Sequence, residues 1–133
     1  MLLIARREKL LKELVATLAL AEAPHLYFSC NVAEAASVEK VCRKILSDNL
    51  LPDVLIFNAG VGGMFDVENI DVDRFEHIFR VNFFSVIYFL RHLLPPIMER
   101  NSGMIAAVGS LAGTRGMPRS APYASSKALS KPQ

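Results

Sequence analysis

The sequence GSLAGTRGMPRSAPYASSK, residues 109–127, decides how the rest of the chain is interpreted. It follows the apolar run MIAAV, so it is predicted to begin where a buried strand ends. Its glycine-containing loop leads to Pro122, which is typical of the first turn of a helix. Tyr123 and Lys127 then share one face of that helix, one turn apart. With Ser110 at the strand end they form a candidate proton-transfer site, although an isolated Tyr–Lys pair is more often a solvated surface pair.

The composition is that of one globular domain, which we assign to residues 1–133. The chain is 52% apolar and 21% charged, with a net charge of +2 and no basic run, so nucleic acid is not expected as a partner. Its two cysteines, Cys30 and Cys42, have no Cys or His at the spacing of metal ligands. We therefore predict no metal site and reduced cysteines in the cytoplasm.

Two apolar stretches bear on membrane association. Residues 14–21 are apolar and precede an Ala-Glu-Ala sequence that resembles a signal-peptide cleavage site, but Glu8 and Glu13 lie just before them. A half-buried helix fits this segment better, because apolar residues repeat with helical period at Leu10, Leu11, Leu14, Leu18 and Ala21. The longest apolar stretch, residues 81–90, is far shorter than a membrane span. We predict a soluble protein without a membrane partner.

Short apolar runs alternate with amphipathic helices along the chain. Strands are expected at residues 2–5, 25–30, 53–57 and 104–108, and helices at 7–22 and, capped by Ser37, at 37–49. The inner face of the second helix is predicted to hold Val38, Val41, Cys42 and Ile45. Because the strands lack polar alternation, the pattern predicts an α/β fold whose parallel sheet is covered on both faces.

The longest predicted helix begins at the N-cap Asp71, and Pro95-Pro96 is expected to bend or end it. One stripe of it is apolar except at Asn82: Phe75, Ile78, Phe79, Asn82, Phe83, Val86, Ile87, Leu90, Leu94 and Ile97. A buried amide left unpaired costs about 1–3 kcal/mol, so Asn82 needs a partner. That partner is a backbone group freed at a kink, a water, or a catalytic network, and periodicity does not choose among them.

Four features, in order along the chain, carry a family resemblance. Asn58-Ala59-Gly60 follows a predicted strand, Asn82 lies on the long helix, Ser110 follows the next strand, and Tyr123-x-x-x-Lys127 begins a helix. This ordered set resembles the short-chain dehydrogenase/reductase family. The resemblance implies a Rossmann-like, doubly wound parallel sheet and hydride transfer between a nicotinamide cofactor and a carbonyl or alcohol substrate.

The resemblance also implies a role for each of these residues. Tyr123 would be the acid/base, and Lys127 would lower the pKa of Tyr123 while holding the cofactor ribose. Ser110 would orient the substrate carbonyl, and Asn82 would hold a helix kink and a water next to Lys127. Asn58-Ala59-Gly60 would line the adenosine side of the cofactor.

Cofactor preference is predicted from the end of the first strand, where Arg6 and Arg7 stand and no acid does. A carboxylate there favours NAD, whereas arginine suits the 2′-phosphate of NADP. We therefore predict NADP rather than NAD, the alternative being that the pair is simply a solvated helix start. Asn31-Val32 would contact the adenine, although the family commonly has Asp in place of Asn31.

The family's glycine-rich phosphate loop has no counterpart in this chain. The chain is therefore expected to be a partial Rossmann domain without the first strand and the C-terminal strands, with two open strand edges around residues 2–5 and 53–57. We expect it to bind NADPH weakly or not at all. The alternative is a non-enzymatic product that keeps only interaction surfaces. In the family, helices matching residues 74–99 and 121–131 often pack against a second subunit, so the full-length form is expected to be a homo-oligomer.

Overall fold

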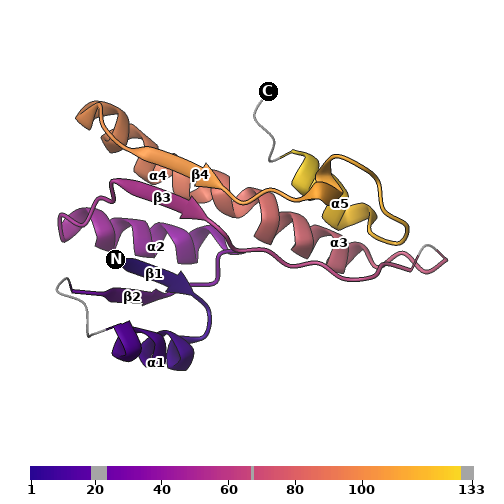
Figure 1. The fold of residues 1–133 in the computed structure, drawn as a ribbon, viewed down its shortest axis with the longest axis horizontal. Coiled ribbons are helices and arrows are strands. Elements are labelled where there is room, and N and C mark those ends of the chain that lie inside the picture. Colours follow the sequence, from indigo (N-terminus) through magenta and orange to yellow (C-terminus); the bar gives the residue numbers. More distant parts are fainter. Residues whose placement is uncertain (19–23, 67, 130–133) are drawn as a thin grey trace.

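The structure, a computed structural model, describes residues 1–18, 24–66 and 68–129 (Figure 1). Strands and helices alternate, which confirms the α/β class. In chain order the elements are β1 (Leu2–Ala5), α1 (Glu8–Leu18), β2 (Leu26–Ser29), α2 (Ala35–Ser47), β3 (Val54–Phe57), α3 (Val72–Phe79), the π-turn η1 (Arg80–Phe84), α4 (Ser85–Arg100), β4 (Met104–Ala107), the 3-10 turn η2 (Leu111–Gly113) and α5 (Ala121–Ala128).

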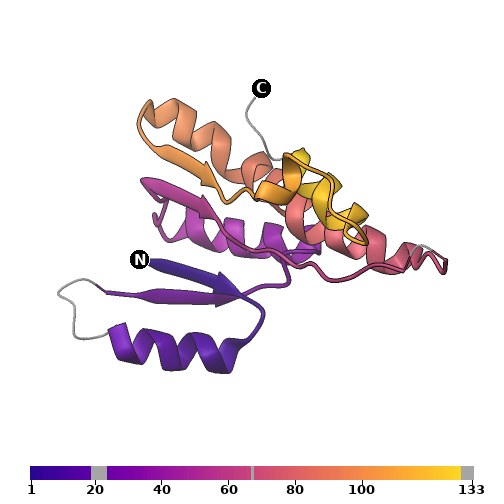
Figure 2. The same cartoon turned by 45° about the vertical axis from the view of Figure 1, so that its right-hand side comes forward.

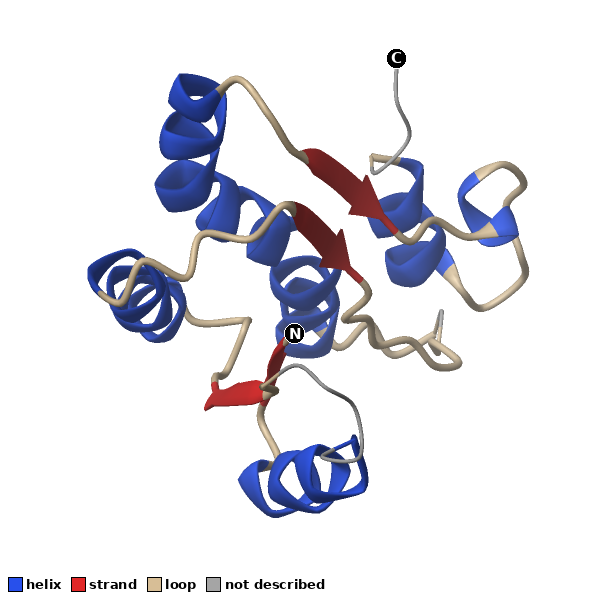
Figure 3. Ribbon diagram, turned by 60° about the vertical axis from the view of Figure 1, so that its left-hand side comes forward, coloured by secondary structure: helices blue, strands red, loops and turns tan. Residues whose placement is uncertain are grey.

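The strands form two separate parallel pairs, β1 with β2 and β3 with β4, and within the described residues no hydrogen-bonded ladder joins β1 to β3 (Figure 3). The main-chain oxygens of Met1 and Ala5 accept hydrogen bonds from the β2 side. Successive residues of a strand point their backbone N–H and C=O groups to opposite sides, so the N–H and C=O groups of Ile4 point away from β2. The main-chain oxygens of Asp53 and Phe57 accept hydrogen bonds from the β4 side. By the same alternation, the N–H and C=O groups of Ile56 point away from β4. The expected pair of open edges is therefore present.

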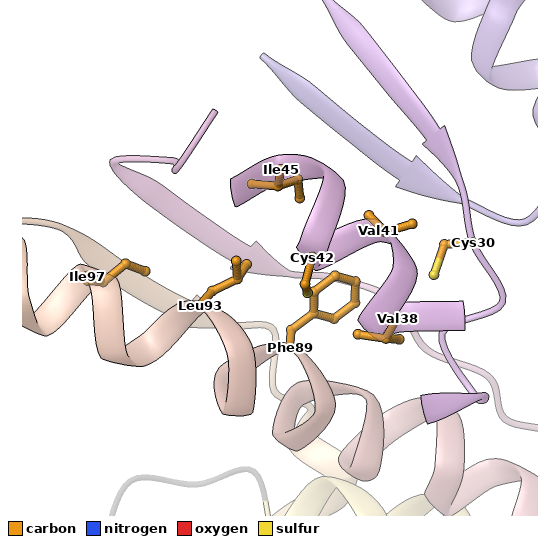
Figure 4. Packing of buried hydrophobic residues seen from close by; sticks show 8 residues of the cluster. All are labelled: Cys30, Val38, Val41, Cys42, Ile45, Phe89, Leu93 and Ile97. Atoms are coloured by element: carbon orange, nitrogen blue, oxygen red, sulfur yellow. The ribbon is translucent and has the colours of Figure 1, made fainter. Parts of the chain in front are cut away.

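Both strand pairs pack on one core formed by α2 and α4 (Figure 4). The buried cluster consists of Cys30, Val38, Val41, Cys42, Ile45, Phe89, Leu93 and Ile97. Leu2 and Ile4 of β1, and Leu55 and Phe57 of β3, pack against this cluster. The two helices thus hold the strand pairs side by side, with β1 and β3 running the same way (Figure 2).

The other face of β3 and β4 stays exposed, so the prediction of a sheet covered on both faces is wrong for this pair. Side chains alternate along β3, so Leu55 faces the core while Ile56, 63% exposed, faces away. Val54 and Met104 are exposed as well. On α1, Leu11 is buried but Leu10 and Leu14 are exposed, which corrects the stripe predicted there, and Ala21 lies outside the described residues.

Helix α2 begins earlier than predicted, with Glu34 rather than Ser37 at its N-cap. The Ser37 hydroxyl instead accepts a hydrogen bond from the backbone N–H of Asn31, 3.1 Å away, and so ties the preceding loop to the helix. The predicted inner face is confirmed: its four residues, Val38, Val41, Cys42 and Ile45, are all buried.

The long helix begins as predicted, with Asp71 Oδ1 accepting from the N–H of Arg74 at 2.9 Å. Its buried residues, however, are Ile78, Val81, Asn82, Ser85, Phe89, Leu93 and Ile97. Ser85 is therefore a second polar member, and Ile87, placed on the predicted stripe, is exposed. Apolar residues surround most of this helix, so the pattern alone could not select the face that α2 contacts.

A helix end at Pro95-Pro96, one of the two outcomes predicted there, is not found, because α4 continues to Arg100. The helix is capped by Asn101, whose φ of 52° is left-handed. An interior proline costs about 3 kcal/mol, and burial of Leu93 and Ile97 on either side offsets that cost. The helical stretch Val72–Arg100, 29 residues, contains an 18-residue window with a mean hydropathy of 1.3, so it is long and apolar enough to cross a membrane by length and composition. In this fold Phe89, Leu93 and Ile97 of this stretch are part of the buried core.

Candidate active site

The candidate residues gather where β3 and β4 end. Because the strands are parallel, their carboxyl ends lie at the same edge. Asn58-Ala59-Gly60 leaves β3 with all three residues exposed, and Ser110 follows β4. The Ser110 hydroxyl oxygen accepts from the N–H of Ala112 at 3.2 Å, which caps η2. A hydroxyl has one hydrogen of its own, so Ser110 can still donate to a ligand.

Asn82 lies inside the π-turn η1 and is buried. Its Oδ1 accepts from the N–H of Val61 at 2.8 Å, and its Nδ2 donates to the oxygen of Val61 at 2.9 Å and to Ser126 Oγ at 2.9 Å. The helix is irregular here, as the kink hypothesis expected, since a π-turn replaces the regular α-helical ladder. The partners of the amide are nevertheless the loop after β3 and helix α5, rather than its own helix.

Lys127 is buried on α5, and its Nζ donates to the main-chain oxygen of Val108 at 2.7 Å. A buried ammonium needs such partners, and Val108 uses one of its three N–H groups. A Cβ at Gly60 would lie 3.7 Å from Lys127 Nζ and 3.6 Å from Asn82 Oδ1. The absence of a side chain at Gly60 therefore leaves open the space beside both polar atoms.

Tyr123 packs its ring against Gly62, where a Cβ would lie 3.1 Å from the ring. Tyr123 and Lys127 thus face the same loop from the same side of α5, as the four-residue spacing predicted. Gly113 packs against the backbone of the same helix. A Cβ at Gly113 would lie 2.7 Å from the main-chain carbon of Lys127, so only glycine allows η2 to pack this closely on α5.

Ser126 and Gly113 belong to this site, and sequence reasoning missed both. Ser126 is 0% exposed, accepts from Asn82 and donates to the main-chain oxygen of Tyr123 at 2.8 Å. One feature of the sequence could have indicated Ser126: it is a small polar residue between Tyr123 and Lys127, on a helix that must bury one face. Its partner lies 44 residues away, and no local pattern reveals such a contact.

The predicted adenosine side is more open. Arg6 and Arg7 are exposed after β1, and in the described part of the chain neither forms an ion pair; the Arg6 oxygen accepts from Ser29 Oγ at 3.3 Å. The side chain of Asn31 is engaged locally, donating to Glu34 Oε1 at 2.6 Å and accepting from Ala33 N at 3.3 Å. Val32 is half-buried against the core. The structure does not bring these residues together with Tyr123 and Lys127.

The cysteines are separate from the site. Burial raises the pKa of the Cys42 thiol to about 12, and burial also raises the pKa of Cys30. Both are therefore neutral core residues at physiological pH. Among the residues that the structure describes, no group of three His, Cys, Asp or Glu side chains could hold a metal ion.

Comparisons with known proteins agree on one family. The family model for short chain dehydrogenases matches residues 1–131. An NADPH-dependent pterin aldehyde reductase of Arabidopsis thaliana is 29% identical over 104 residues, which cover 77% of this chain and 43% of the relative. A dehydrogenase/reductase SDR family protein 7-like of Drosophila melanogaster is 30% identical over 130 residues, covering 95% and 40%.

Solved structures show the same fold. A closed form of serine dehydrogenase complexed with NADP+ is 27% identical with a TM-score of 0.86, covering 97% of this chain and 51% of that one. NAD+-bound xylitol dehydrogenase has a TM-score of 0.86 at 23% identity, with coverage of 96% and 49%. The chain thus spans about half the length of the proteins that it matches. The expected Rossmann-like fold is confirmed.

Proposed function

The chain belongs to the short-chain dehydrogenase family, and from this membership we propose that it forms the proton-transfer half of an NADP(H)-dependent oxidoreductase site. The observation that carries the proposal is the convergence of Asn82, Tyr123 and Lys127 on residues 60–62. A phenol, a buried ammonium and a fixed amide at the carboxyl edge of a parallel sheet suit acid/base chemistry.

The residues present fit the two ends of a dinucleotide. At one end, Gly60 leaves space beside Lys127 Nζ, whose remaining N–H groups can bind ribose hydroxyls. At the other end, the exposed Arg6 and Arg7 can bind a 2′-phosphate. The chain's seven glycines include none in the turn from β1 to α1, so the pyrophosphate between these ends has no glycine-rich cradle here.

The chemistry that follows concerns one proton. A nicotinamide cofactor, when bound, supplies the hydride that reduces a carbonyl carbon. As negative charge develops on the carbonyl oxygen, Tyr123 Oη gives it a proton, and Ser110 donates a hydrogen bond to the same oxygen. The Lys127 charge stabilises the phenolate that remains. In the reverse direction Tyr123 takes the proton from an alcohol.

We propose NADP over NAD because the two residues directly after β1 are arginines, with no carboxylate between β1 and α1. The name of the Arabidopsis relative supports this choice, whereas the similar xylitol dehydrogenase holds NAD+. We further propose a cytoplasmic location, a small carbonyl or alcohol substrate, and a homo-oligomer for the full-length enzyme. The exposed Phe84 and Ile87 on the long helix support a subunit contact there.

Titration of the purified chain with NADPH, followed by nicotinamide fluorescence, tests the cofactor half of this proposal. We expect saturation only at millimolar NADPH or not at all, and weaker binding of NADH. In the chain, or in a form extended ahead of Met1 if the chain alone binds no NADPH, Arg6→Ala should lower NADPH affinity by about tenfold, because it removes a charge-assisted bond to phosphate. Arg115→Ala, at another exposed arginine, is the control. Equal affinity for NADH and NADPH, or no effect of Arg6→Ala, would contradict the NADP preference.

Turnover tests the proton-transfer half. We expect little reduction of a small aldehyde by the 133-residue chain, and measurable reduction once a strand, a glycine-rich turn and a helix are joined ahead of Met1. Tyr123→Phe should then lower turnover at least about 100-fold. Tyr88→Phe, on α4, is the matched control and should have no such effect. Turnover that survives Tyr123→Phe would exclude Tyr123 as the acid, and robust turnover by the chain alone would show that its cofactor site is complete.

A further inference from the structure

Ser126 joins two elements that are distant in sequence. It lies on α5 directly before Lys127 and three residues after Tyr123. Its hydroxyl hydrogen is directed back to the Tyr123 main-chain oxygen at 2.8 Å, a bond that serine readily makes inside a helix. With the hydrogen so placed, Oγ presents a lone pair outward, and Asn82 Nδ2 donates to it at 2.9 Å.

The orientation of the Asn82 amide follows from its other two bonds. The N–H of Val61 requires an acceptor, so Oδ1 must face it, at 2.8 Å. One hydrogen of Nδ2 then reaches the oxygen of Val61, at 2.9 Å. A flipped amide would place two N–H groups against each other at Val61, which excludes the alternative assignment. The second Nδ2 hydrogen is therefore directed at α5, where Ser126 accepts it.

This link lies next to the atoms of the proposed reaction. Oδ1 of Asn82 and Nζ of Lys127 are both within 3.7 Å of the position that a Cβ would take at Gly60. A rotation of the amide, or a shift of α5 along its axis, would change the space between these two polar atoms. The Asn82–Ser126 bond ties the π-turn to the helix carrying Tyr123 and Lys127.

We infer that Ser126 is a positioning residue: its hydroxyl fixes the Asn82 amide against α5, so that Asn82, Tyr123 and Lys127 keep one relative geometry. Its consequence for catalysis rests on the proposed function, whereas the link itself does not. The simpler role for a buried serine is to fill space. Ser85 offers that comparison, because it is also buried and donates to an oxygen of its own helix, Val81 O at 2.6 Å. In the described structure the Ser85 side chain makes no hydrogen bond outside the continuous helix 72–100.

Hydrogen exchange of the Asn82 side-chain amide, measured by NMR, tests the link without any cofactor. In the unmodified chain both Nδ2 hydrogens should exchange more slowly than those of Asn101, whose residue is exposed. Ser126→Ala should speed the exchange of one of them at least about tenfold, because it loses its acceptor. Ser126→Cys keeps the side-chain size but supplies only a weak acceptor, and it should have the same effect. Ser85→Ala should leave both rates unchanged.

The outcomes separate the two roles. Exchange of the Asn82 hydrogens as fast as that of Asn101 in the unmodified chain would overturn the link, even if every Ser126 variant failed to fold. Unchanged exchange in Ser126→Ala or Ser126→Cys would also overturn it, as would an equal acceleration in Ser85→Ala. A change confined to Ser126 variants would support it.

A second measurement separates this inference from the proposed function. In a form of the chain that reduces an aldehyde, Ser126→Ala should lower kcat about tenfold while changing the KM for NADPH less than about twofold. If the amide exchange responds as expected but neither Ser126→Ala nor Tyr123→Phe affects turnover, the link stands and the proposed function fails. If the exchange does not respond, the link fails whatever the turnover.

Discussion

Around Asn82 the buried polar groups are paired across three segments, whereas between β1 and β3 two strand edges have no partner strand among the described residues. In the first region the partners come from the chain itself: the main chain of Val61 and the hydroxyl of Ser126 bond to the Asn82 amide, and the main-chain oxygen of Val108 accepts from Lys127. In the second region, residues of β1, β2 and β3 pack against the buried cluster that α2 and α4 carry (Figure 4).

The difference shows which part of the site depends on this chain alone. The geometry of the residues proposed for acid/base chemistry depends on contacts between residues 58–63, the π-turn and α5, all of which lie in the described part of the chain. The cofactor side depends on what fills the space between β1 and β3, since dinucleotides bind at the carboxyl edge near the centre of a doubly wound sheet. The proton-transfer half should therefore be formed in the isolated chain while cofactor affinity is low.

The largest effect is expected from closing the open edges. Joining a five-residue apolar strand, a glycine-rich turn and an amphipathic helix ahead of Met1 should raise NADPH affinity about a hundredfold or more, because each of two charge-assisted bonds to phosphate is worth about 1.5–3 kcal/mol. Nicotinamide fluorescence measures the gain. The same extension with alanines in its turn is the control and should bind no better than the original chain.

A substitution in the core should lower the free energy of unfolding much more than a substitution on the exposed face of β3. Leu93 lies in the core and is 0% exposed. Leu93→Ala should lower the free energy of unfolding by about 3 kcal/mol, because it leaves a cavity. Ile56 lies on the exposed face of β3, so Ile56→Ala should lower the free energy of unfolding by less than about 0.5 kcal/mol. Urea unfolding measures both. An equal loss at Ile56 would mean that another surface covers this face in solution.

A smaller loss of stability is expected from disturbing the packing of η2 on α5, in the region around Asn82. Gly113→Ala should cost about 2 kcal/mol, since its Cβ would meet the backbone of Lys127 at 2.7 Å. Gly116→Ala is the matched control, because a Cβ there meets no atom within 4 Å. If thermal unfolding showed the two variants to be equally stable, the close approach of η2 to α5 would be contradicted.

The smallest effect concerns Cys42 at alkaline pH. Its pKa of about 12 in the folded chain exceeds the ordinary thiol value, so above pH 9 the unfolded chain loses a proton that the folded chain keeps. Unfolding free energy should therefore fall with rising pH by up to about 1.4 kcal/mol per pH unit from this group. The fall between pH 9 and 10 should be shallower in Cys42→Val. Parallel curves for the two proteins would exclude a buried, neutral thiol as the cause.

Much of this architecture was predictable because it follows from local sequence. The four strands, the Asp71 cap and the α2 inner face each depend on residues near one another, and the missing glycine-rich turn predicted the open edges. The placement of Asn82, Tyr123 and Lys127 also followed, from a family motif of fixed order.

The errors share a physical origin in contacts that sequence periodicity cannot see. Apolar residues surround α4, so only packing on α2 selects Phe89 and Leu93 over Ile87 and Leu94 for the core. Ser126 and Gly113 matter because α5 meets the π-turn and η2 in three dimensions. The face of β3 that carries Ile56 is exposed because no described element packs on it.

Backbone hydrogen exchange at four strand residues tests most directly whether the sheet is open between β1 and β3 while the acid/base half is formed. The N–H groups of Ile4 and Ile56 point away from β2 and β4, whereas those of Leu3 and Leu55 point toward them. We predict slow exchange at Leu3 and Leu55, within the two ladders, and fast exchange at Ile4 and Ile56, together with protection of the Asn82 side-chain amide. Protection of Ile4 and Ile56 equal to that of Leu3 and Leu55 would contradict the account.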